Sequence, residues 1–200
     1  MCSHGTSGTP FSVALYPAIQ ALEIALGNSL NATIAEAFDN PWWLDANPPI
    51  LKPQEQESVK KAKEELARQR KPLEVGRVVA ELSLGFWTSL LDARYEQLLW
   101  PRLLQPTFLH MPRHARTRKN LSSRFNQIRH LRNRVFHHEP IWRRDLDRQH
   151  TEILEAVGWI SPSLRDTIRI VDRFSEVYTL GSNPHRERLF RFLRESGYLR

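Results

Sequence analysis

The stretch from residue 131 to residue 142 combines the side-chain types that metal-free chemistry on a phosphodiester needs. It contains Arg132, Asn133, His137 and Glu139 within eight positions. Arginine is a permanently charged, planar donor that matches the geometry of phosphate. Histidine is the side chain that gains and loses a proton near neutral pH without special tuning. Together these residues could hold a phosphodiester and move protons around it, which predicts a catalytic or binding role for this stretch.

Cleavage of RNA without a metal sets three requirements that fit this stretch. A base takes the proton of the ribose 2′-hydroxyl, an acid protonates the leaving 5′ oxygen, and a cation stabilises the charge that develops on the phosphate. Histidine can act as acid or base, each role contributing roughly 10²–10⁴ in rate, and arginine can supply the cation. Because one helix offers one well-placed histidine, a symmetric dimer that brings two copies of the helix together would complete the site.

Helical geometry adds detail to this arrangement. Asn133 and His137 are four residues apart and therefore neighbours on a helix, whereas Arg132 and His137, five apart, do not share one face. The helix must stop before Pro140, because a proline pushes the preceding residue out of the helical region. His137 thus falls in the last turn, where the negative end of the helix dipole favours a cationic side chain. We expect His137 to act as an acid or as a phosphate clamp.

Each of these residues also has a purely structural interpretation. Arg132 could pair with a buried carboxylate, His138 could cap the helix, and Glu139 could stabilise the turn or pair with an arginine. A metal site formed by His137, His138 and Glu139 is disfavoured, because adjacent residues on a helix point apart. We therefore expect neither a metal nor a cofactor.

Glu23 is the carboxylate that could pair with Arg132. It lies inside an apolar run from residue 21 to residue 26, and an unpaired buried carboxylate is costly, so it must reach solvent or a cation. The other histidines are expected at the surface or satisfied by neighbours: His110, His114, His130, His150 and His185. The tryptophans are expected to pack in the core rather than stack on bases, since their neighbours are apolar: Trp42, Trp43, Trp87, Trp100, Trp142 and Trp159.

Length and composition indicate an ordinary globular chain. Its 200 residues fit one domain, and 40% hydrophobic with 26% charged residues is typical of soluble proteins. The single cysteine, Cys2, excludes an internal disulfide, which suits the reducing cytoplasm. The longest uncharged run, residues 5–22, is interrupted by Pro17, so no membrane span or secretion signal is expected.

The positive charge is concentrated around the motif. Residues 102–148 contain 12 Lys and Arg against three Asp and Glu, a net charge of +9, whereas the rest of the chain carries −2. A localised basic segment attracts polyanions and so favours RNA as a partner. The same segment could also form a solvated helix face or a surface for an acidic protein.

Apolar residues at three-and-four spacing predict an all-α chain of about seven helices. Proline-rich loops are expected over 39–53 and 101–112. The predicted helices cover 17–38, with Pro17 in the first turn, then 54–71, 73–99 as two helices or one kinked near Leu84-Gly85, 116–138, 145–157, 161–181, and a last helix that opens at Asn183-Pro184.

The run from Leu131 to Ile141 resembles a known family signature. Arg132-Asn133-x-x-x-His137 is similar to the R-N-x-x-x-H form of the R-x4–6-H motif of the HEPN (higher eukaryotes and prokaryotes nucleotide-binding) superfamily. The longer run is similar to the LRNRxxHHEPI signature of Abi-like (abortive infection) bacterial proteins. Three further blocks agree in order, at residues 21–26, 83–91 and 159–162, so the resemblance covers residues 14–178.

The resemblance implies a fold and an activity. It implies a HEPN-like helical bundle at residues 14–180, preceded by a flexible segment at 1–13 and followed by a C-terminal helix at 181–200 that packs on the domain. It implies a homodimeric, metal-independent endoribonuclease that leaves 2′,3′-cyclic phosphate and 5′-hydroxyl ends. Such a protein acts in the cytoplasm as a toxin or in phage defence, and an antitoxin protein is a further expected partner.

The resemblance also assigns roles to residues of this chain. Arg132 and His137 would be the catalytic pair, and Asn133 would orient the histidine or the phosphate. Family members often carry an arginine before the asparagine of the first block, where this chain has Gly27. The supporting residues would be Glu23, Asn28, His138 and Glu139. The expected RNA contacts on the same helix are Arg124, Arg129 and Arg134.

Two other functions are compatible with the same residues. A non-catalytic HEPN module would use the arginines to bind RNA, a nucleotide or a partner protein, while His137 only makes hydrogen bonds. A scaffold in a larger defence complex would use the basic segment to meet an acidic neutralising protein. RNA binding without strand scission would indicate the first function, and co-purification of a partner encoded beside the chain would indicate the second.

Overall fold

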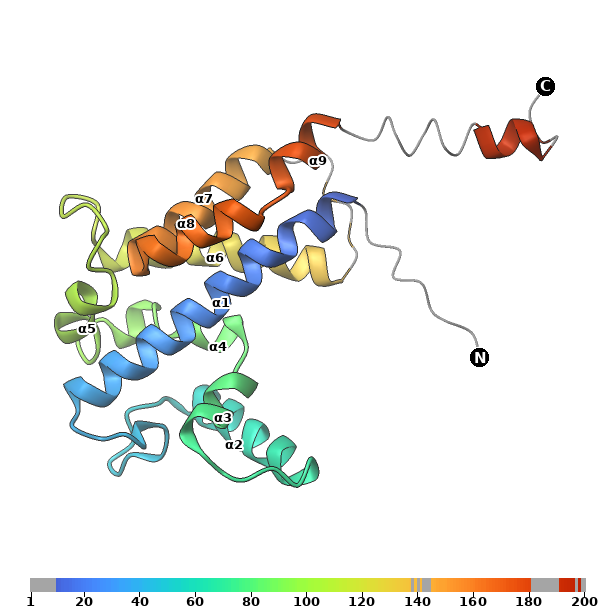
Figure 1. Cartoon of the computed structure of the whole chain (residues 1–200). Helices are drawn as coiled ribbons and strands as arrows, with labels where there is room; N and C mark the ends of the chain where they lie inside the picture. Colours follow the sequence, from blue (N-terminus) through green and yellow to red (C-terminus); the bar gives the residue numbers. More distant parts are fainter. Residues whose placement is uncertain are drawn as a thin grey trace.

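The chain is all-α in the computed structural model, which describes residues 10–137, 139, 141, 145–180, 191–196 and 198. These residues contain no strand, and they form ten helices rather than the expected seven or so. The difference arises because a proline-rich segment that was predicted as a loop is helical, and because one long predicted helix is divided in two. Figure 1 shows the helices arranged around one long central helix, α1.

Helix α1 (Pro10–Ala37) is the central element of the bundle. It begins before the predicted first turn, so Pro17 lies inside the helix and the prediction of its start was wrong. An interior proline removes one backbone hydrogen bond. The burial of Ala14, Leu15 and Ala18 on either side of Pro17 outweighs that loss. Of the segment predicted as flexible, residues 1–9 lie outside the described part and residues 10–13 belong to α1.

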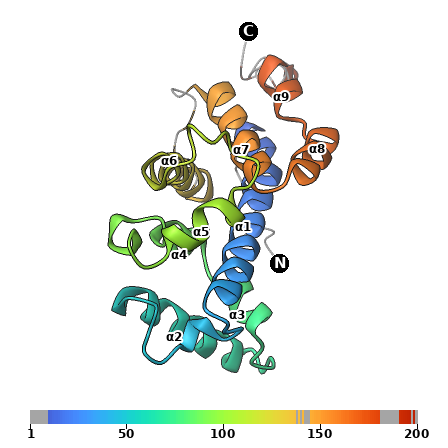
Figure 2. The same cartoon turned by 90° about the vertical axis from the view of Figure 1, so that its left-hand side faces the viewer.

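Helices α6 and α7 pack along one side of α1. Helix α6 (Arg118–Phe136) is capped by Thr117, whose Oγ1 accepts the backbone N–H of Asn120 at 3.2 Å. Helix α7 (Leu146–Ile160) is capped by Asp145 and lies between α6 and α8 in Figure 2. Five apolar residues at three-and-four spacing form the buried face of α6: Leu121, Phe125, Ile128, Leu131 and Val135.

Two short helices replace the single helix predicted for 161–181. Helix α8 (Pro162–Val171) begins after Ser161, whose side chain accepts the Leu164 N–H, and α9 (Phe174–Leu180) follows a break at Asp172. The break lets Asp172 Oδ2 lie 2.7 Å from His150 Nε2 on α7. It also stacks the Phe174 ring on the same imidazole, with centroids 4.2 Å apart. Contacts with α7 therefore end α8 early.

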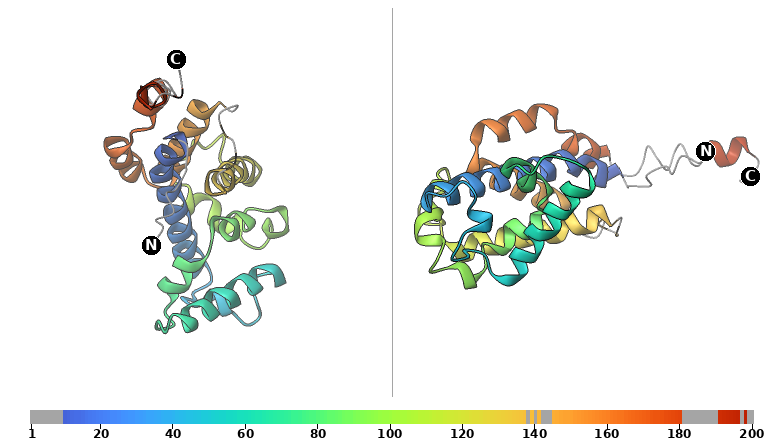
Figure 3. Two further views of the ribbon diagram at one scale, coloured as in Figure 1. Left: turned by 90° about the vertical axis from the view of Figure 1, so that its right-hand side faces the viewer. Right: turned by 90° about the horizontal axis from the view of Figure 1, so that it is seen from below.

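The other end of the molecule is built from α2 (Pro53–Arg68) and α3 (Val75–Glu81), away from α8 and α9 in Figure 3. Val59, Ala62 and Leu66 of α2 are buried. Helix α4 (Leu84–Ser89) is separated from α3 at residues 82–83, so of the two alternatives left open for residues 73–99 the structure has two helices. Single turns of 3-10 helix, η1 (Trp43–Asp45) and η2 (Ala93–Tyr95), complete the connections.

The predicted loop over 101–112 is wrong, because residues 100–107 form α5 (Trp100–Thr107). Pro101 occupies the first turn, where a missing N–H is harmless, and Pro106 lies in the last turn. Leu103 and Phe108 are fully buried. The two prolines permit either a loop or a helix over residues 100–107. Packing of this segment on α1 and of Phe108 on Phe125 of α6 favours the helix.

A buried carboxylate connects α2 to α4 and η2. Glu55 is 2% exposed and accepts hydrogen bonds from Ser89 Oγ at 2.9 Å, from the Tyr95 hydroxyl at 2.8 Å, and from Arg94. The Tyr95 hydroxyl in turn accepts the Lys52 N–H at 2.9 Å. Burial, together with the neighbouring carboxylate, raises the pKa of Tyr95 well above its usual range. The sequence patterns gave no signal for this network.

Several predictions fall on residues outside the described part. These include the opening of a last helix at Asn183-Pro184 and most of the C-terminal segment 181–200, of which residues 191–195 form a short helix. Among the helices that the structure describes, none is long and apolar enough to cross a membrane.

Candidate functional site

A cleft of about 720 Å³ opens between α1, α3, α4 and α6. It contains three of the predicted site residues, namely Glu23, Asn28 and Arg132. Aromatic side chains from three helices form much of its wall. The lining residues are Tyr16, Gln20, Glu23, Ile24, Gly27, Asn28, Gly76, Val79, Ala80, Leu82, Trp87, Arg132 and Phe136.

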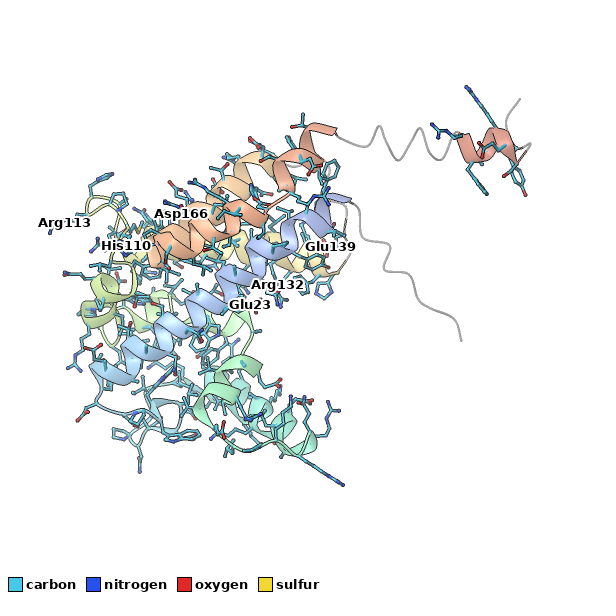
Figure 4. The ribbon with its side chains drawn as sticks, viewed as in Figure 1. Glu23, His110, Arg113, Arg132, Glu139 and Asp166 are labelled. Atoms are coloured by element: carbon cyan, nitrogen blue, oxygen red, sulfur yellow. The ribbon has the colours of Figure 1, made fainter. Side chains whose placement is uncertain are left out.

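Arg132 is held in this cleft from two sides. Its Nε lies 3.6 Å from Glu23 Oε2, and the two side chains are 23% and 21% exposed. Its guanidinium carbon lies 4.2 Å from the ring centroid of Phe136, one turn further along α6. Phe136 in turn meets Tyr16 of α1 edge-on, with centroids 5.0 Å apart. Figure 4 shows Arg132 and Glu23 side by side where α1 crosses α6.

Glu23 contacts two helices besides its own. While Oε2 faces Arg132, Oε1 accepts the backbone N–H of Leu84 at 2.6 Å. Leu84 is the first residue of α4, and the Ser83 side chain does not cap that helix. The carboxylate therefore supplies the missing cap. The predicted pairing of Glu23 with Arg132 is confirmed, and the cap on α4 is a second contact that sequence patterns did not indicate.

Gly27 is required by the packing of α1 against α4. A Cβ atom at this position would lie 2.9 Å from Trp87 Nε1 and 3.0 Å from its Cε2. Trp87 is 1% exposed, so its indole has little room to move. The indole thus lies directly against the α1 backbone at Gly27.

His137 and Asn133 lie at the C-terminal end of α6, outside the cleft lining. His137 is the C-cap residue, its backbone N–H donates to the Asn133 carbonyl at 2.9 Å, and it is exposed. Arg132 points instead towards α1. The five-residue spacing predicted this separation of Arg132 and His137, and a single chain does not bring the two together at one cleft.

The turn after α6 is stabilised by Glu139. Its backbone N–H donates to the Arg134 carbonyl at 2.9 Å, and its Oε2 lies 3.7 Å from Arg134 Nη1. This confirms the structural interpretation of Glu139. His138 and Pro140 lie outside the described residues, as does Trp142.

Three of the 12 positive charges in the basic segment are paired with carboxylates from elsewhere in the fold. Arg124 Nη1 lies 2.6 Å from Glu155 Oε2 and its guanidinium lies 5.1 Å from the ring of Trp159. Arg118 Nε lies 3.2 Å from Glu96 Oε2. With the pair of Arg132 and Glu23, three of the positive charges in this segment are compensated from outside it. The positive surface is therefore weaker than the sequence count indicates.

Arg129 is a different case on the same helix. Its Nε is buried, and none of the described residues accepts a hydrogen bond from it. The side chain as a whole is partly exposed. Arg129 thus stays a candidate phosphate contact, while Arg124 and Arg134 each face a carboxylate.

The remaining histidines agree with expectation where they are described. His110, His114 and His130 are exposed, His150 is buried against Asp172, and His185 lies outside the described residues. Burial lowers the pKa of His150, and the nearby Asp172 carboxylate partly opposes this shift. No group of three or more His, Cys, Asp or Glu residues in the described part of the chain could hold a metal ion.

The prediction that the tryptophans pack in the core is wrong for one of them. Trp42 is 36% exposed, because Trp43 takes the buried position in the same turn. Four others are buried as expected, namely Trp43, Trp87, Trp100 and Trp159.

Comparison of the chain with known protein families, with curated proteins and with solved structures found no match.

Proposed function

We propose that the chain is a metal-independent endoribonuclease of the HEPN type, which acts on cytoplasmic RNA as a toxin or abortive-infection effector. One observation carries the proposal. Arg132 is anchored by Glu23 and Phe136 at the edge of an open cleft, and the exposed His137 follows it at the end of the same helix. The resemblance of residues 131–141 to the Abi-like signature supports the same function.

The two motif side chains would divide the chemistry between them. The guanidinium of Arg132 would stabilise the negative charge that develops on the phosphate. His137 would exchange a proton with the ribose 2′-hydroxyl or with the leaving 5′ oxygen. Because His137 does not line the cleft that holds Arg132, a homodimer would bring the second histidine to the scissile bond. The products would carry 2′,3′-cyclic phosphate and 5′-hydroxyl ends.

Expression in bacteria tests this function. The wild-type chain should arrest growth, whereas His137→Ala and Arg132→Ala should not. His130→Ala is a matched control, since His130 is exposed on the same helix but outside the motif. Purified protein should cleave total RNA in EDTA, and end analysis should find 2′,3′-cyclic phosphates. If the wild type and both variants grow alike and cleave no RNA, the ribonuclease proposal is wrong.

A non-catalytic RNA-binding module is the second candidate, and the charge of the cleft favours it. Glu23 already compensates Arg132, so the guanidinium has less positive potential to offer a transition state. Such a module would bind RNA with an affinity that falls steeply with salt but would leave the strand intact. An acidic antitoxin that co-purifies with the chain would instead indicate that the basic surface meets a protein.

A further inference from the structure

We propose that the cleft between α1, α3, α4 and α6 binds a single nucleobase, whose edge meets the Arg132–Glu23 pair. The inference rests on the proposed function in one respect, since RNA is taken as the source of the base. It adds a base-recognition site to a motif that otherwise acts on the phosphodiester.

The walls of the cleft suit a flat aromatic ring. Tyr16 and Phe136 contribute aromatic rings that are at least partly exposed, and Ile24 adds exposed aliphatic surface. Phe136 is 40% exposed and Ile24 is 54% exposed, although both are large and apolar. Bases stack on such side chains with little regard to sequence, because every base has a π-face. A bound ring would remove this apolar surface from water.

The polar groups of the cleft match the edge of a base. The guanidinium of Arg132 offers N–H donors beside the acceptor Oε2 of Glu23, 3.6 Å from Nε. Guanidinium groups bind purine acceptors, and carboxylates accept hydrogen bonds from exocyclic amino groups. The amides of Gln20 and Asn28 line the same cleft and can complete the recognition of an edge.

The electrostatics of the cleft suit a neutral ring. Glu23 compensates Arg132, so a neutral base placed beside the pair meets little net charge. The phosphodiester attached to that base is then expected at the rim of the cleft, between Arg132 and the exposed His137 at the end of α6.

Binding of free nucleosides tests the site, because they carry the base without a phosphate. Titration of the full chain with adenosine, guanosine, cytidine and uridine, followed by NMR or calorimetry, should show saturable binding of at least one. Ile24→Trp should fill the cleft mouth, and Phe136→Ala should remove one wall. Each should weaken nucleoside affinity at least about tenfold, which corresponds to about 1.4 kcal/mol. Leu109→Trp is the control, since Leu109 is 57% exposed and outside the cleft.

The outcomes separate this site from the proposed function. Loss of nucleoside binding in Ile24→Trp but not in Leu109→Trp, with both variants folded by circular dichroism, supports the base site. If the wild type cleaves RNA but binds none of the four nucleosides, the base site is wrong and the ribonuclease function stands. If it binds nucleosides at the cleft but neither cleaves nor binds RNA, the base site stands and the proposed function is wrong. Competition by inorganic phosphate alone would identify an anion site and overturn the inference.

Discussion

Glu23 connects three helices through one carboxylate. It belongs to α1, accepts the first N–H of α4 at 2.6 Å and compensates Arg132 of α6. The Glu23 side chain is 21% exposed, so the carboxylate is largely removed from water. Both of its partners are therefore needed to offset the cost of burying it. The residue that positions the candidate catalytic arginine therefore also stabilises the local fold.

Replacement of Glu23 should separate these two contributions. Glu23→Ala should lower the free energy of unfolding by about 1–3 kcal/mol, because it leaves the Leu84 N–H and the buried Arg132 Nε without the carboxylate. Glu23→Gln should lower it less, because its amide oxygen can still accept the Leu84 N–H. Urea denaturation followed by circular dichroism measures the difference.

Glu81→Ala is a suitable control for the Glu23 variants. Glu81 is exposed on α3, close to the cleft but outside its lining. Its removal should change stability by no more than about 0.5 kcal/mol. Equal losses from Glu23→Ala and Glu81→Ala would contradict the role given to Glu23.

At the scale of elements, the crossing of α1 and α4 depends on one glycine and one tryptophan. Gly27 lets the indole of Trp87 approach the α1 backbone, and this contact forms part of the cleft wall. Glycine inside a helix usually lowers stability by about 1 kcal/mol relative to alanine. Here the close packing of α1 on α4, which only a glycine permits, offsets that loss of stability.

Gly27→Ala should therefore destabilise the protein in spite of the higher helix propensity of alanine. The expected loss is about 1–3 kcal/mol, since the new methyl group would overlap the buried indole. In a Trp87→Phe background, which removes the contacting indole nitrogen, the same substitution should be less harmful. A double-mutant cycle from denaturation curves measures the coupling. If Gly27→Ala stabilises the wild type, the packing explanation fails.

At the scale of the whole molecule, charge pairs between distant segments determine how much of the basic segment faces solvent. Arg118, Arg124 and Arg132 each meet a carboxylate from outside residues 102–148. Long-range attraction of RNA is thus expected to depend on fewer arginines than the sequence contains. Of the three predicted RNA contacts on α6, Arg129 is the one for which the described residues show no carboxylate partner.

The stability of the bundle should also depend on pH through His150. Burial lowers the pKa of this imidazole in the folded state, so the unfolded chain binds the proton more readily. Stability from the neutral ring is then fully present above the ordinary histidine pKa, near 6.5, and is lost as the pH falls below it. The urea midpoint should fall as the buffer is changed from about pH 7.5 to about pH 5.5.

A substitution identifies His150 as the source of this dependence. His150→Asn should be less stable at high pH, because the stack on Phe174 is lost. Its urea midpoint should change less between the two pH values, since the titrating group is gone. His130→Asn, at an exposed position, should keep the wild-type pH dependence. A pH dependence that persists unchanged in His150→Asn would assign the effect to other groups.

The amino-acid sequence by itself determined the local features of this protein. Apolar residues at three-and-four spacing predicted most of the helices, among them α2 and α6. It also indicated the pairing of Glu23 with Arg132, because a carboxylate in an apolar helix needs a cation. Each of these follows from interactions within a few residues or from a rule about burial.

Only the tertiary structure decided the features that depend on residues far apart in the chain. It made residues 100–107 helical in spite of two prolines, and it ended α8 where Asp172 reaches His150. It placed the Leu84 N–H on Glu23, 61 positions away, and formed the cleft from four helices. The physical reason is that packing energy depends on which faces meet in space, and this information is absent from any local window of sequence.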